Sequence, residues 1–514
     1  MESLVKILAN KIKYIFGVSG GGLSLSLITE LEKRGVKFYP VAHEAAGAIM
    51  AGAASGSGET KAAAISIKGP GLANMVPGIL LNHYEYRPAI TISESYSKDS
   101  PFEKMHKRLN HKEVIQVLVK ANIDSSNESN INEAIALAET EIPGPIHIEL
   151  APQENIFIKK ENYNFSAEEE INTILDSIKN TKRPALVLGS VAKRQLKDIN
   201  WQELKIPVFT TASAKGAINE ESDFSAGIIT GEIKDLSPEK ILVNADLIIA
   251  IGLRNTEVVV PHKFDSPLII FDSVSGRIHR GFNAKEKIMT PDLKNTAEKL
   301  LQRLKQKEWG KNLIKNLRDK LDKELLSDFW MPANIFRALN DEKRNNNLTL
   351  VLDTGIFCTV GEIVFKAEIP EEFIGSSNGR FMGTAIPTAI GFSIANPDRN
   401  VICTAGDGGI RPYFPEIKLA VEENLPIFFI LMADSAYGTF SDKAKANNLS
   451  ERAYKIRNSS WVRAAEAIGC SAHKVKNLEQ FINAFEEFSK VKKPMFIEMD
   501  FNADKYSLMA DNLR

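Results

Sequence analysis

Short runs of hydrophobic residues alternate with longer helical stretches along the first third of the chain. The short runs are rich in β-branched and aromatic residues, which is typical of buried strands. These strand candidates lie at 14–18, 36–42, 62–67, 88–93 and 145–150. Stretches such as 25–35 and 44–56 stand between them and have the composition of helices. The alternation predicts a parallel sheet covered by helices.

Two further sets of the same kind follow along the chain. The strand candidates of the second set are 184–190, 206–212, 245–252 and 267–272, and those of the third are 348–355, 400–406, 426–433 and 494–500. A linker-like stretch at 155–180 precedes the second set, and a charged helical segment at 297–326 precedes the third. We therefore expect an α/β protein of three doubly wound parallel-sheet domains, at 1–160, 181–310 and 330–514.

Composition agrees with this organisation and narrows the classes of partner. The chain has 514 residues, 44% of them hydrophobic, enough for about three domains of ordinary size. Its net charge of -1 gives no bulk reason to expect nucleic acid or an anionic membrane as partner. Neither a signal peptide nor a long apolar span is evident, so we expect a cytoplasmic protein. Cys358, Cys403 and Cys470 form no CxxC pair and are expected to be buried thiols.

Polar and glycine residues follow two strand candidates of the third domain. The segment after 400–405 is Gly406, Asp407, Gly408 and Gly409, and the segment after 426–433 is Asp434, Ser435, Ala436, Tyr437 and Gly438. Carboxyl ends of parallel strands meet at one sheet edge, where glycines let backbone N–H groups approach phosphate oxygens. Asp407 and Asp434 supply hard oxygen ligands for Mg²⁺, and the carbonyl of Ala436 could complete the protein's share.

The spacing of these segments resembles that of thiamine-diphosphate enzymes, because 24 residues lie between Gly408 and Ala433. The segment 381–391 is similar to the one that, in acetolactate synthases and their relatives, places a bulky side chain beneath the bent cofactor. The resemblance implies that Met382 is this wedge, and that the carbonyl of Arg380 accepts a hydrogen bond from the cofactor's 4′-amino group. It also implies a cofactor-binding role for the residues of both strand ends: Gly406, Asp407, Gly408, Gly409, Asp434, Ala436, Tyr437 and Gly438.

Three segments of the first domain resemble the same family. They are the early glycine turn at 16–22, the pair His43-Glu44, and the Gly-Pro-Gly loop at 69–74. The resemblance implies that Gly20, Gly21 and Asn74 contact the cofactor, and that Glu44 is the catalytic acid. A carboxylate within hydrogen-bond reach of pyrimidine N1′ favours the imino tautomer, whose 4′-nitrogen can remove the proton from thiazolium C2.

The sequence also departs from the family pattern. Ala433-Asp434 stands where two asparagines are usual, and Phe357 stands where acetolactate synthases often have a polar residue. The early turn has Gly21 where pyruvate decarboxylases have an acid, and the chain has no adjacent histidine pair, which favours the carboligase branch. The resemblance implies that Gly21, His106 and Lys107 lie near the substrate, where the two basic residues could pair with an anionic group. Alternatively they belong to a solvated basic face.

The resemblance implies a pyrimidine-binding first domain, a middle domain and a diphosphate-binding third domain, with thiamine diphosphate and Mg²⁺ as cofactors. The active site would lie between two subunits of a homodimer or homotetramer. It leaves open whether the middle domain binds FAD, a nucleotide such as ADP, or nothing. The expected reaction is decarboxylation of a 2-oxo acid followed by carboligation to an aldehyde or a second 2-oxo acid. The alternatives are a simple 2-oxo-acid decarboxylase, including one for a phosphono- or sulfo-substituted substrate, and a noncatalytic paralogue.

Overall fold

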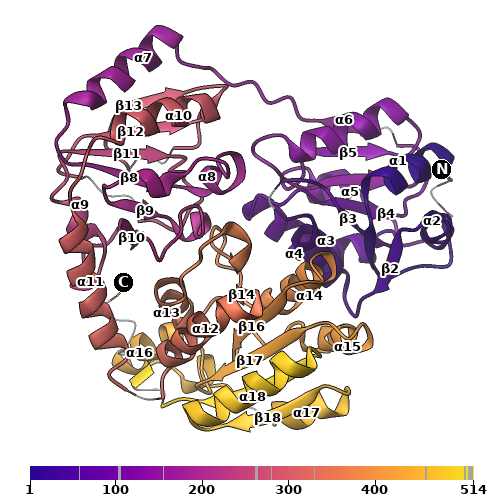
Figure 1. Cartoon of the computed structure of the whole chain (residues 1–514). Coiled ribbons are helices and arrows are strands. Elements are labelled where there is room, and N and C mark those ends of the chain that lie inside the picture. The colour runs from indigo at the N-terminus through magenta and orange to yellow at the C-terminus, as the bar shows by residue number, and fades with distance from the viewer. Residues whose placement is uncertain are drawn as a thin grey trace.

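Three sheets of mainly parallel strands, each flanked by helices, make up the computed structural model of the chain (Figure 1). The structure describes residues 1–514 except 57, 102, 104–105, 154–155, 261–263, 279–280, 329, 458–459, 503–504, 507–512 and 514. The predicted fold class is confirmed.

The first sheet has the strand order β2-β1-β3-β4-β6-β5-β7, in which the short β7 pairs antiparallel with β5. Its strands are β1 (Tyr14–Gly17), β2 (Lys37–Pro40), β3 (Ala62–Ser66), β4 (Ile90–Ser93), β5 (Ala121–Asp124), β6 (Ile146–Glu149) and β7 (Phe157–Ile158). Its helices are α1 (Glu2–Lys11), α2 (Leu23–Glu32), α3 (Glu44–Ser55), α4 (Pro70–Tyr84), α5 (His111–Ile115) and α6 (Glu128–Glu139).

The middle sheet has the order β10-β9-β8-β11-β12-β13 and is parallel throughout. Its strands are β8 (Pro184–Leu188), β9 (Val208–Thr210), β10 (Ser225–Ile228), β11 (Leu247–Ile251), β12 (Leu268–Asp272) and β13 (Ala284–Met289). The helices of this part are α7 (Glu168–Ser177), α8 (Ser190–Gln195), α9 (Glu239–Leu242), α10 (Leu293–Leu304) and α11 (Lys311–Leu325).

The third sheet, ordered β15-β14-β16-β17-β19-β18, is also parallel throughout. Its strands are β14 (Leu348–Leu352), β15 (Phe373–Gly375), β16 (Asn400–Gly406), β17 (Ile427–Ala433), β18 (Ser471–Val475) and β19 (Met495–Asp500). Its helices are α12 (Pro332–Asn346), α13 (Ile356–Val364), α14 (Ala385–Ala395), α15 (Ile417–Glu422), α16 (Gly438–Ala446), α17 (Trp461–Ala467) and α18 (Leu478–Val491).

The first and third sheets share one continuous hydrophobic core. This core includes Met50 of α3 together with Ile386 and Ile390 of α14, and it extends to both sheets. The two helices approach closely, since a Cβ at Gly391 would lie 2.3 Å from the carbonyl oxygen of Met50. The middle sheet packs around separate cores of its own. The first and third domains therefore form one packed body.

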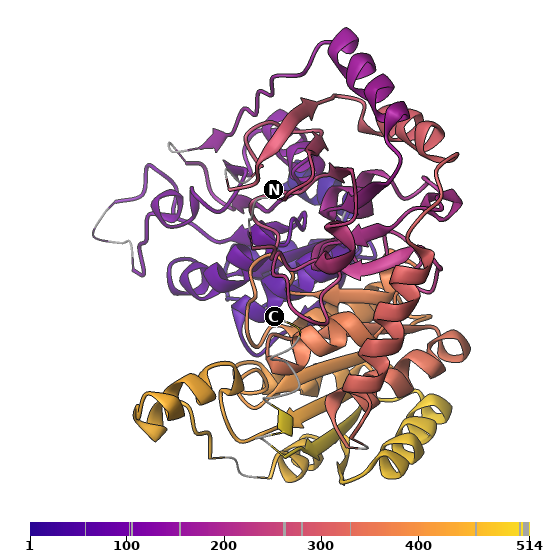
Figure 2. The ribbon, with the colours of Figure 1, turned by 90° about the vertical axis from the view of Figure 1, so that its left-hand side faces the viewer.

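One predicted segment differs in detail. The expected helical stretch at 297–326 is two helices, because the chain turns at Gly310, which has the left-handed φ of 87°. The second of these, α11, runs from the middle sheet toward the third (Figures 1 and 2). Among the described residues, no helix is both long and apolar enough to cross a membrane. The three cysteines are buried and form no disulfide, as expected.

Candidate active site

The ends of β16 and β17 bring Asp407 and Asp434 together at one edge of the third sheet. The two strands are adjacent, with Gly406 opposite Met432. Asp407 is 1% exposed, and its Oδ2 accepts hydrogen bonds from the backbone N–H groups of Asp434 (2.7 Å) and Ser435 (2.8 Å). Two segments that are separated in the sequence therefore lie side by side, as expected for the carboxyl ends of adjacent parallel strands.

The Asp434 carboxyl sits in a turn beside that of Asp407. Its Oδ1 accepts a hydrogen bond from the N–H of Ala436 at 3.1 Å, and Ser435 adopts the left-handed φ of 57°. Burial, followed by the negative charge of Asp407, raises the pKa of Asp434. Two acidic groups held this close lower each other's tendency to ionise unless a cation lies between or beside them.

The predicted wedge, Met382, is 46% exposed and lies on the loop between β15 and α14. Its sulfur would lie 2.9 Å from a Cβ placed at Gly408, so the thioether covers the glycine segment that follows β16. Gly409 is equally constrained, because a Cβ there would lie 2.0 Å from the Asp353 carboxylate.

Asp353, which directly follows β14, holds in place the loop that carries Met382, called the wedge loop from here on. Both of its carboxyl oxygens lie 2.9 Å from the backbone N–H of Gly383, which follows Met382. Burial raises the pKa of Asp353 to about 7. Sequence reasoning missed this residue, although it directly follows a buried strand, as Asp407 does.

Arg380 lies in the same loop with a left-handed φ of 49°. Its guanidinium forms an ion pair with Glu362 of α13, where Nη2 and Oε2 are 3.0 Å apart, and also donates to Cys358. This places the side chain away from solvent and leaves the predicted cofactor contact to the carbonyl. Phe357 is buried in the core, against Gly406, and offers no polar group to a ligand.

A carboxylate of the first domain also holds the loop that carries Arg380 and Met382. Glu85, which follows α4, accepts hydrogen bonds from the backbone N–H groups of Ser377 (3.2 Å), Asn378 (3.1 Å) and Gly379 (3.0 Å). Sequence reasoning missed Glu85, because these partners lie 292–294 positions away in the chain.

Glu44 is the first residue of α3 and is 8% exposed. Its Oε2 accepts a hydrogen bond from the side-chain amide of Asn74 at 3.1 Å, so these two predicted site residues lie together. His43 caps the helix by accepting from the N–H of Ala45 at 3.1 Å. The preceding turn is held by Glu416, a third-domain residue whose carboxylate accepts from the N–H groups of Ala42 (3.2 Å) and His43 (3.1 Å).

The early glycine turn packs on Glu94, another residue that sequence reasoning missed. The Glu94 carboxylate accepts from the N–H (2.9 Å) and the hydroxyl (2.6 Å) of Ser24 and pairs with Lys68 at 3.2 Å. A Cβ at Gly20 would be 2.5 Å from Ile67, whereas a Cβ at Gly21 would meet nothing within 4 Å. The turn is therefore tight at Gly20 and open at Gly21.

His106 and Lys107 are exposed in the single chain. The Lys107 carbonyl packs against Gly69, where a Cβ would be 2.1 Å from its oxygen, and the His106 carbonyl accepts from the Tyr96 hydroxyl at 2.9 Å. The Gly69 N–H in turn donates to the buried ring of His111 at 3.3 Å. The basic pair is thus attached to the loop that leads to Asn74, with its side chains in solvent.

Family models match the chain in three successive parts. The N-terminal and C-terminal thiamine pyrophosphate binding domains match residues 1–114 and 353–499, and the central domain of thiamine pyrophosphate enzymes matches 171–300. The chain belongs to the thiamine pyrophosphate enzyme family. Thiamine pyrophosphate is the thiamine diphosphate inferred from the sequence motifs.

Relatives of this thiamine pyrophosphate enzyme align over nearly its whole length. A probable acetolactate synthase large subunit of Methanococcus aeolicus is 24% identical over 99% of this chain and 92% of its own. An acetolactate synthase of Bacillus subtilis is 21% identical over 98% and 93%, respectively. A pyruvate oxidase of Lactiplantibacillus plantarum is 21% identical over 100% of this chain and 90% of its own.

The strand-end residues suit a divalent cation bound together with a diphosphate. Among the described residues, no group of three or more His, Cys, Asp or Glu side chains is arranged to hold a metal. At these strand ends, the described residues that could bind a cation are the Asp407 and Asp434 carboxylates and nearby carbonyls, a set that Mg²⁺ accepts when phosphate oxygens and water complete it. The added charge of Asp434, in place of an asparagine, increases the need for a cation.

The carboxyl edge of the middle sheet is closed by carboxylates of the chain itself. After β8, Oε1 of Glu257 accepts from the N–H of Ser190 at 2.7 Å, and burial raises the pKa of this acid. After β10, Oε1 of Glu239 accepts from the N–H of Gly231 at 2.7 Å. In a doubly wound domain such N–H groups would bind the phosphates of a dinucleotide.

The ends of β11 and β12, at the same edge, are joined by an ion pair. Arg254, which follows β11, donates Nη2 to Oδ1 of Asp272 at 2.6 Å and Nε to Oδ2 at 2.9 Å, and it also pairs with Glu141 of the first domain. The edge thus presents acidic groups where FAD or ADP would place its own negative charges. These residues do not fit either ligand.

Proposed function

We propose that this thiamine pyrophosphate enzyme is a Mg²⁺-dependent carboligase that decarboxylates a 2-oxo acid and joins the remaining fragment to an aldehyde or a second 2-oxo acid. The observation that carries the proposal is the early turn, which is open at Gly21 and has no acid there. A simple decarboxylase must protonate its product and keep other carbonyls out, whereas a carboligase must admit a second carbonyl. Open space at Gly21, with no acid at that position, favours the second task.

When bound, thiamine diphosphate supplies a nucleophilic carbon and an electron sink for the loss of CO₂. Asp407, Asp434 and the Ala436 carbonyl would hold Mg²⁺ against the diphosphate, where Gly408 and Gly409 leave the backbone accessible. Met382 would support the bend of the cofactor, and the Arg380 carbonyl would orient the 4′-amino group. Glu44 would share a proton with pyrimidine N1′, fixed by the Asn74 amide and by the turn that Glu416 holds.

The exposed position of Met382 supports a site completed by a second subunit. Met382 is exposed in the single chain beside the strand ends proposed to bind the cofactor, and the family resemblance implies a second subunit at this place. We therefore propose a homodimer or homotetramer in which the Glu44 edge of one subunit faces the Met382 edge of another. The exposed pair His106 and Lys107 would then lie on the rim of the substrate entrance, at the loop that leads to Asn74.

The test is a screen of 2-oxo acids with the Mg²⁺- and thiamine-diphosphate-loaded protein, with and without aldehyde acceptors, read by mass spectrometry. A carboligase gives a product whose mass is the sum of acceptor and decarboxylated donor. A simple decarboxylase gives only the aldehyde. In that case phosphono- and sulfo-substituted donors are the first to compare, because His106 and Lys107 would pair with such groups. A protein that purifies without bound thiamine diphosphate and turns over no 2-oxo acid would be a noncatalytic paralogue.

A further inference from the structure

One carboxylate of the first domain accepts hydrogen bonds from a whole turn of the third. Glu85 directly follows α4, and the turn at 376–380 lies between β15 and α14, just before Met382. The carboxylate accepts from the backbone N–H groups of residues 377, 378 and 379 at 3.2, 3.1 and 3.0 Å, respectively. Its Oε1 also accepts from the hydroxyl of Ser376 at 3.2 Å. Three N–H groups and one hydroxyl of the wedge loop thus converge on one side chain of another domain.

The hydroxyl of Ser376 carries this contact further along the loop. A serine hydroxyl has one proton to donate and lone pairs with which to accept. Its proton is directed to Glu85, and its oxygen accepts from the backbone N–H of Phe381 at 2.7 Å. The N–H of Phe381 and the carbonyl of Arg380 belong to one peptide unit, in which they point in opposite directions. The hydroxyl therefore sets the direction of the Arg380 carbonyl.

Other contacts hold the same turn in one arrangement. The N–H of Arg380 donates to the carbonyl of Ser376 at 3.1 Å, and Arg380 adopts the left-handed φ of 49°. The ring of Tyr84, the last residue of α4, packs edge-on against that of Phe381, with their centroids 5.7 Å apart. Each backbone N–H from 377 to 381 thus has an acceptor, and the end of α4 supports the turn through both a carboxylate and a ring.

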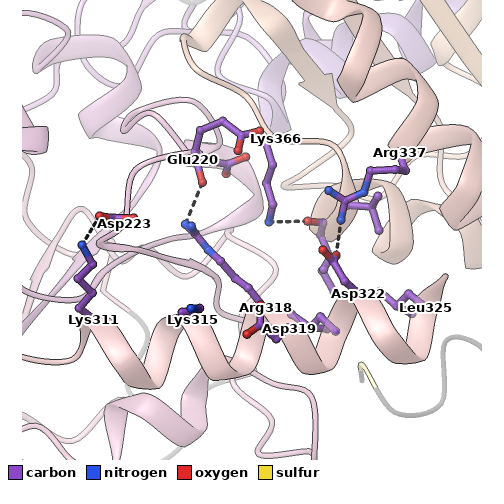
Figure 3. A pocket seen from close by; sticks show the side chains of 14 residues that line it. Glu220, Asp223, Lys311, Lys315, Arg318, Asp319, Asp322, Leu325, Arg337 and Lys366 are labelled. Carbon is purple, nitrogen blue, oxygen red and sulfur yellow. Dashed lines mark hydrogen bonds and ion pairs between the residues drawn. The ribbon is translucent and has the colours of Figure 1, made fainter. Parts of the chain in front are cut away.

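Carboxylates at another junction bind side chains instead of backbone. A cavity of about 490 Å³ lies along α11, between the middle and third domains, and is lined by charged residues of both signs (Figure 3). There Asp223 pairs with Lys311 at 2.5 Å, and Asp322 pairs with Arg337. Pairs between such partly exposed side chains contribute little to stability and fix no peptide unit. Glu85 differs because its contacts determine how a backbone segment is oriented.

We propose that Glu85 is a positioning residue for cofactor activation, which acts through Ser376 on the carbonyl of Arg380. The inference rests on the proposed function, which assigns this carbonyl to the cofactor's 4′-amino group. Misplacing a group by about 1 Å in such a site can cost about 10²-fold in rate. In the proposed dimer, the Glu85 and the Glu44 that act on one cofactor would belong to different subunits.

The first test uses the cofactor-free protein and measures amide hydrogen exchange by mass spectrometry, with fragmentation that resolves single residues. Ser376→Ala removes the hydroxyl and should speed exchange at the Phe381 amide by about tenfold or more. Ser377→Ala is the matched control, because Ser377 contributes its backbone N–H to Glu85 and alanine keeps this group. Unchanged exchange at Phe381 in Ser376→Ala would show that the hydroxyl does not hold this peptide unit, and would overturn the proposal.

The second test measures exchange of the C2 proton of bound thiamine diphosphate at saturating cofactor and Mg²⁺. Glu85→Ala and Ser376→Ala should each slow this exchange by about tenfold or more, whereas Ser377→Ala and Asp322→Asn should exchange as wild type. A merely structural role would lower Tm or cofactor affinity and leave the rate in the saturated protein unchanged. Ser376→Ala keeps the bonds between Glu85 and the backbone, so it serves where Glu85→Ala fails to fold.

The outcomes separate this inference from the proposed function. If the wild-type protein does not speed C2 exchange above the rate of free thiamine diphosphate, the proposed function fails and the inference fails with it. If the wild type does speed it, a wild-type rate in Ser376→Ala, or equal slowing in Ser377→Ala, overturns only the role given to Glu85 and Ser376.

Discussion

Glu44 is the first residue of helix α3, a position where acidic residues interact favourably with the helix dipole. A purely structural role at the helix start and a role in cofactor activation therefore predict different consequences for the same substitution. A structural role is nearly satisfied by glutamine, which keeps the size and the oxygen. Glutamine cannot, however, share a proton with pyrimidine N1′ as a carboxylate does.

Glu44→Gln should leave thiamine-diphosphate affinity nearly unchanged, because the proposed diphosphate and Mg²⁺ ligands lie on the third domain. Exchange of the C2 proton of bound cofactor should slow by about 10²–10⁴-fold, the usual contribution of a positioned acid or base. The measurement is hydrogen–deuterium exchange at C2, quenched and read by NMR, with the exposed Glu32→Gln as control. Equal exchange rates in wild type and Glu44→Gln would remove Glu44 from the mechanism.

Asp407→Ala should abolish tight cofactor binding, because it removes the proposed metal ligand and the acceptor that shapes the turn at Asp434 and Ser435. Asp434→Asn, which restores the usual family residue, should bind thiamine diphosphate as tightly as wild type or more tightly. Calorimetric titration at fixed Mg²⁺ compares the three proteins. Wild-type affinity in Asp407→Ala would contradict the metal assignment.

Glu416 gives the fold a pH dependence. The residue is 2% exposed, and burial raises its pKa to about 7. The folded state thus holds this proton more tightly than the unfolded state, so stability from Glu416 is full below about pH 4.5 and is lost as pH rises through about 7. At about 1.4 kcal/mol per pKa unit, the loss is at most about 3 kcal/mol.

Glu416→Gln should therefore flatten the fall in Tm between pH 5 and pH 8. The exposed Glu422→Gln, on the neighbouring helix α15, should retain the wild-type slope. Thermal melts of the cofactor-free proteins across this range provide the comparison. Parallel curves for Glu416→Gln and wild type would show that the acid does not titrate there.

At the scale of elements, strands buried on both faces are readily predicted from sequence, whereas edge strands are not. The runs 184–190 and 426–433 became β8 and β17, whose residues are all buried. The edge strand β13 reads AKEKIM, with alternating charged residues and only its last two residues buried, so no hydrophobic run marks it. The break at Gly310 was missed because a single glycine is compatible with a helix pattern.

The residues of the candidate site likewise include some that can be predicted from the sequence and some that cannot. Residues at strand ends, such as Asp407 and Asp434, are predictable because the parallel order of a sheet brings successive strand ends together. The carboxylates that hold the site loops are not: Glu416 lies 373 positions from His43, and Glu94 lies 70 positions from Ser24. Such pairs arise only from the tertiary fold. The domain bounds and cofactor contacts remain predictions.

The crossing of α3 and α14 depends on the absence of a side chain at Gly391. Gly391→Ala would place a methyl group 2.3 Å from the Met50 carbonyl oxygen, and since backbone cannot yield as a side chain does, the helices must separate. We expect a loss of about 1–3 kcal/mol, seen as a lower Tm. Gly58→Ala, where a Cβ would meet nothing within 4 Å, is the control and should melt as wild type; equal melting of Gly391→Ala would contradict the close approach.

At the scale of the whole molecule, a site between subunits can be tested by mixing two inactive variants. In a dimer of one Glu44→Gln chain and one Asp407→Ala chain, one site would carry both substitutions and the other would carry neither. Random pairing makes half of the dimers mixed, so co-expression should restore about a quarter of wild-type activity. If each site were built within a single chain, the mixture would stay inactive, as each variant is alone.

The core shared by the first and third domains also determines which parts of the chain unfold together. Met50, Ile386 and Ile390 belong to one apolar cluster, so neither domain can melt without exposing the other's interior, and the two should behave as a single cooperative unit. The middle domain is joined to the first through Arg194, Arg254 and Glu141, contacts that acid can break. Partial unfolding should therefore release the middle domain first and leave the two cofactor-binding domains together.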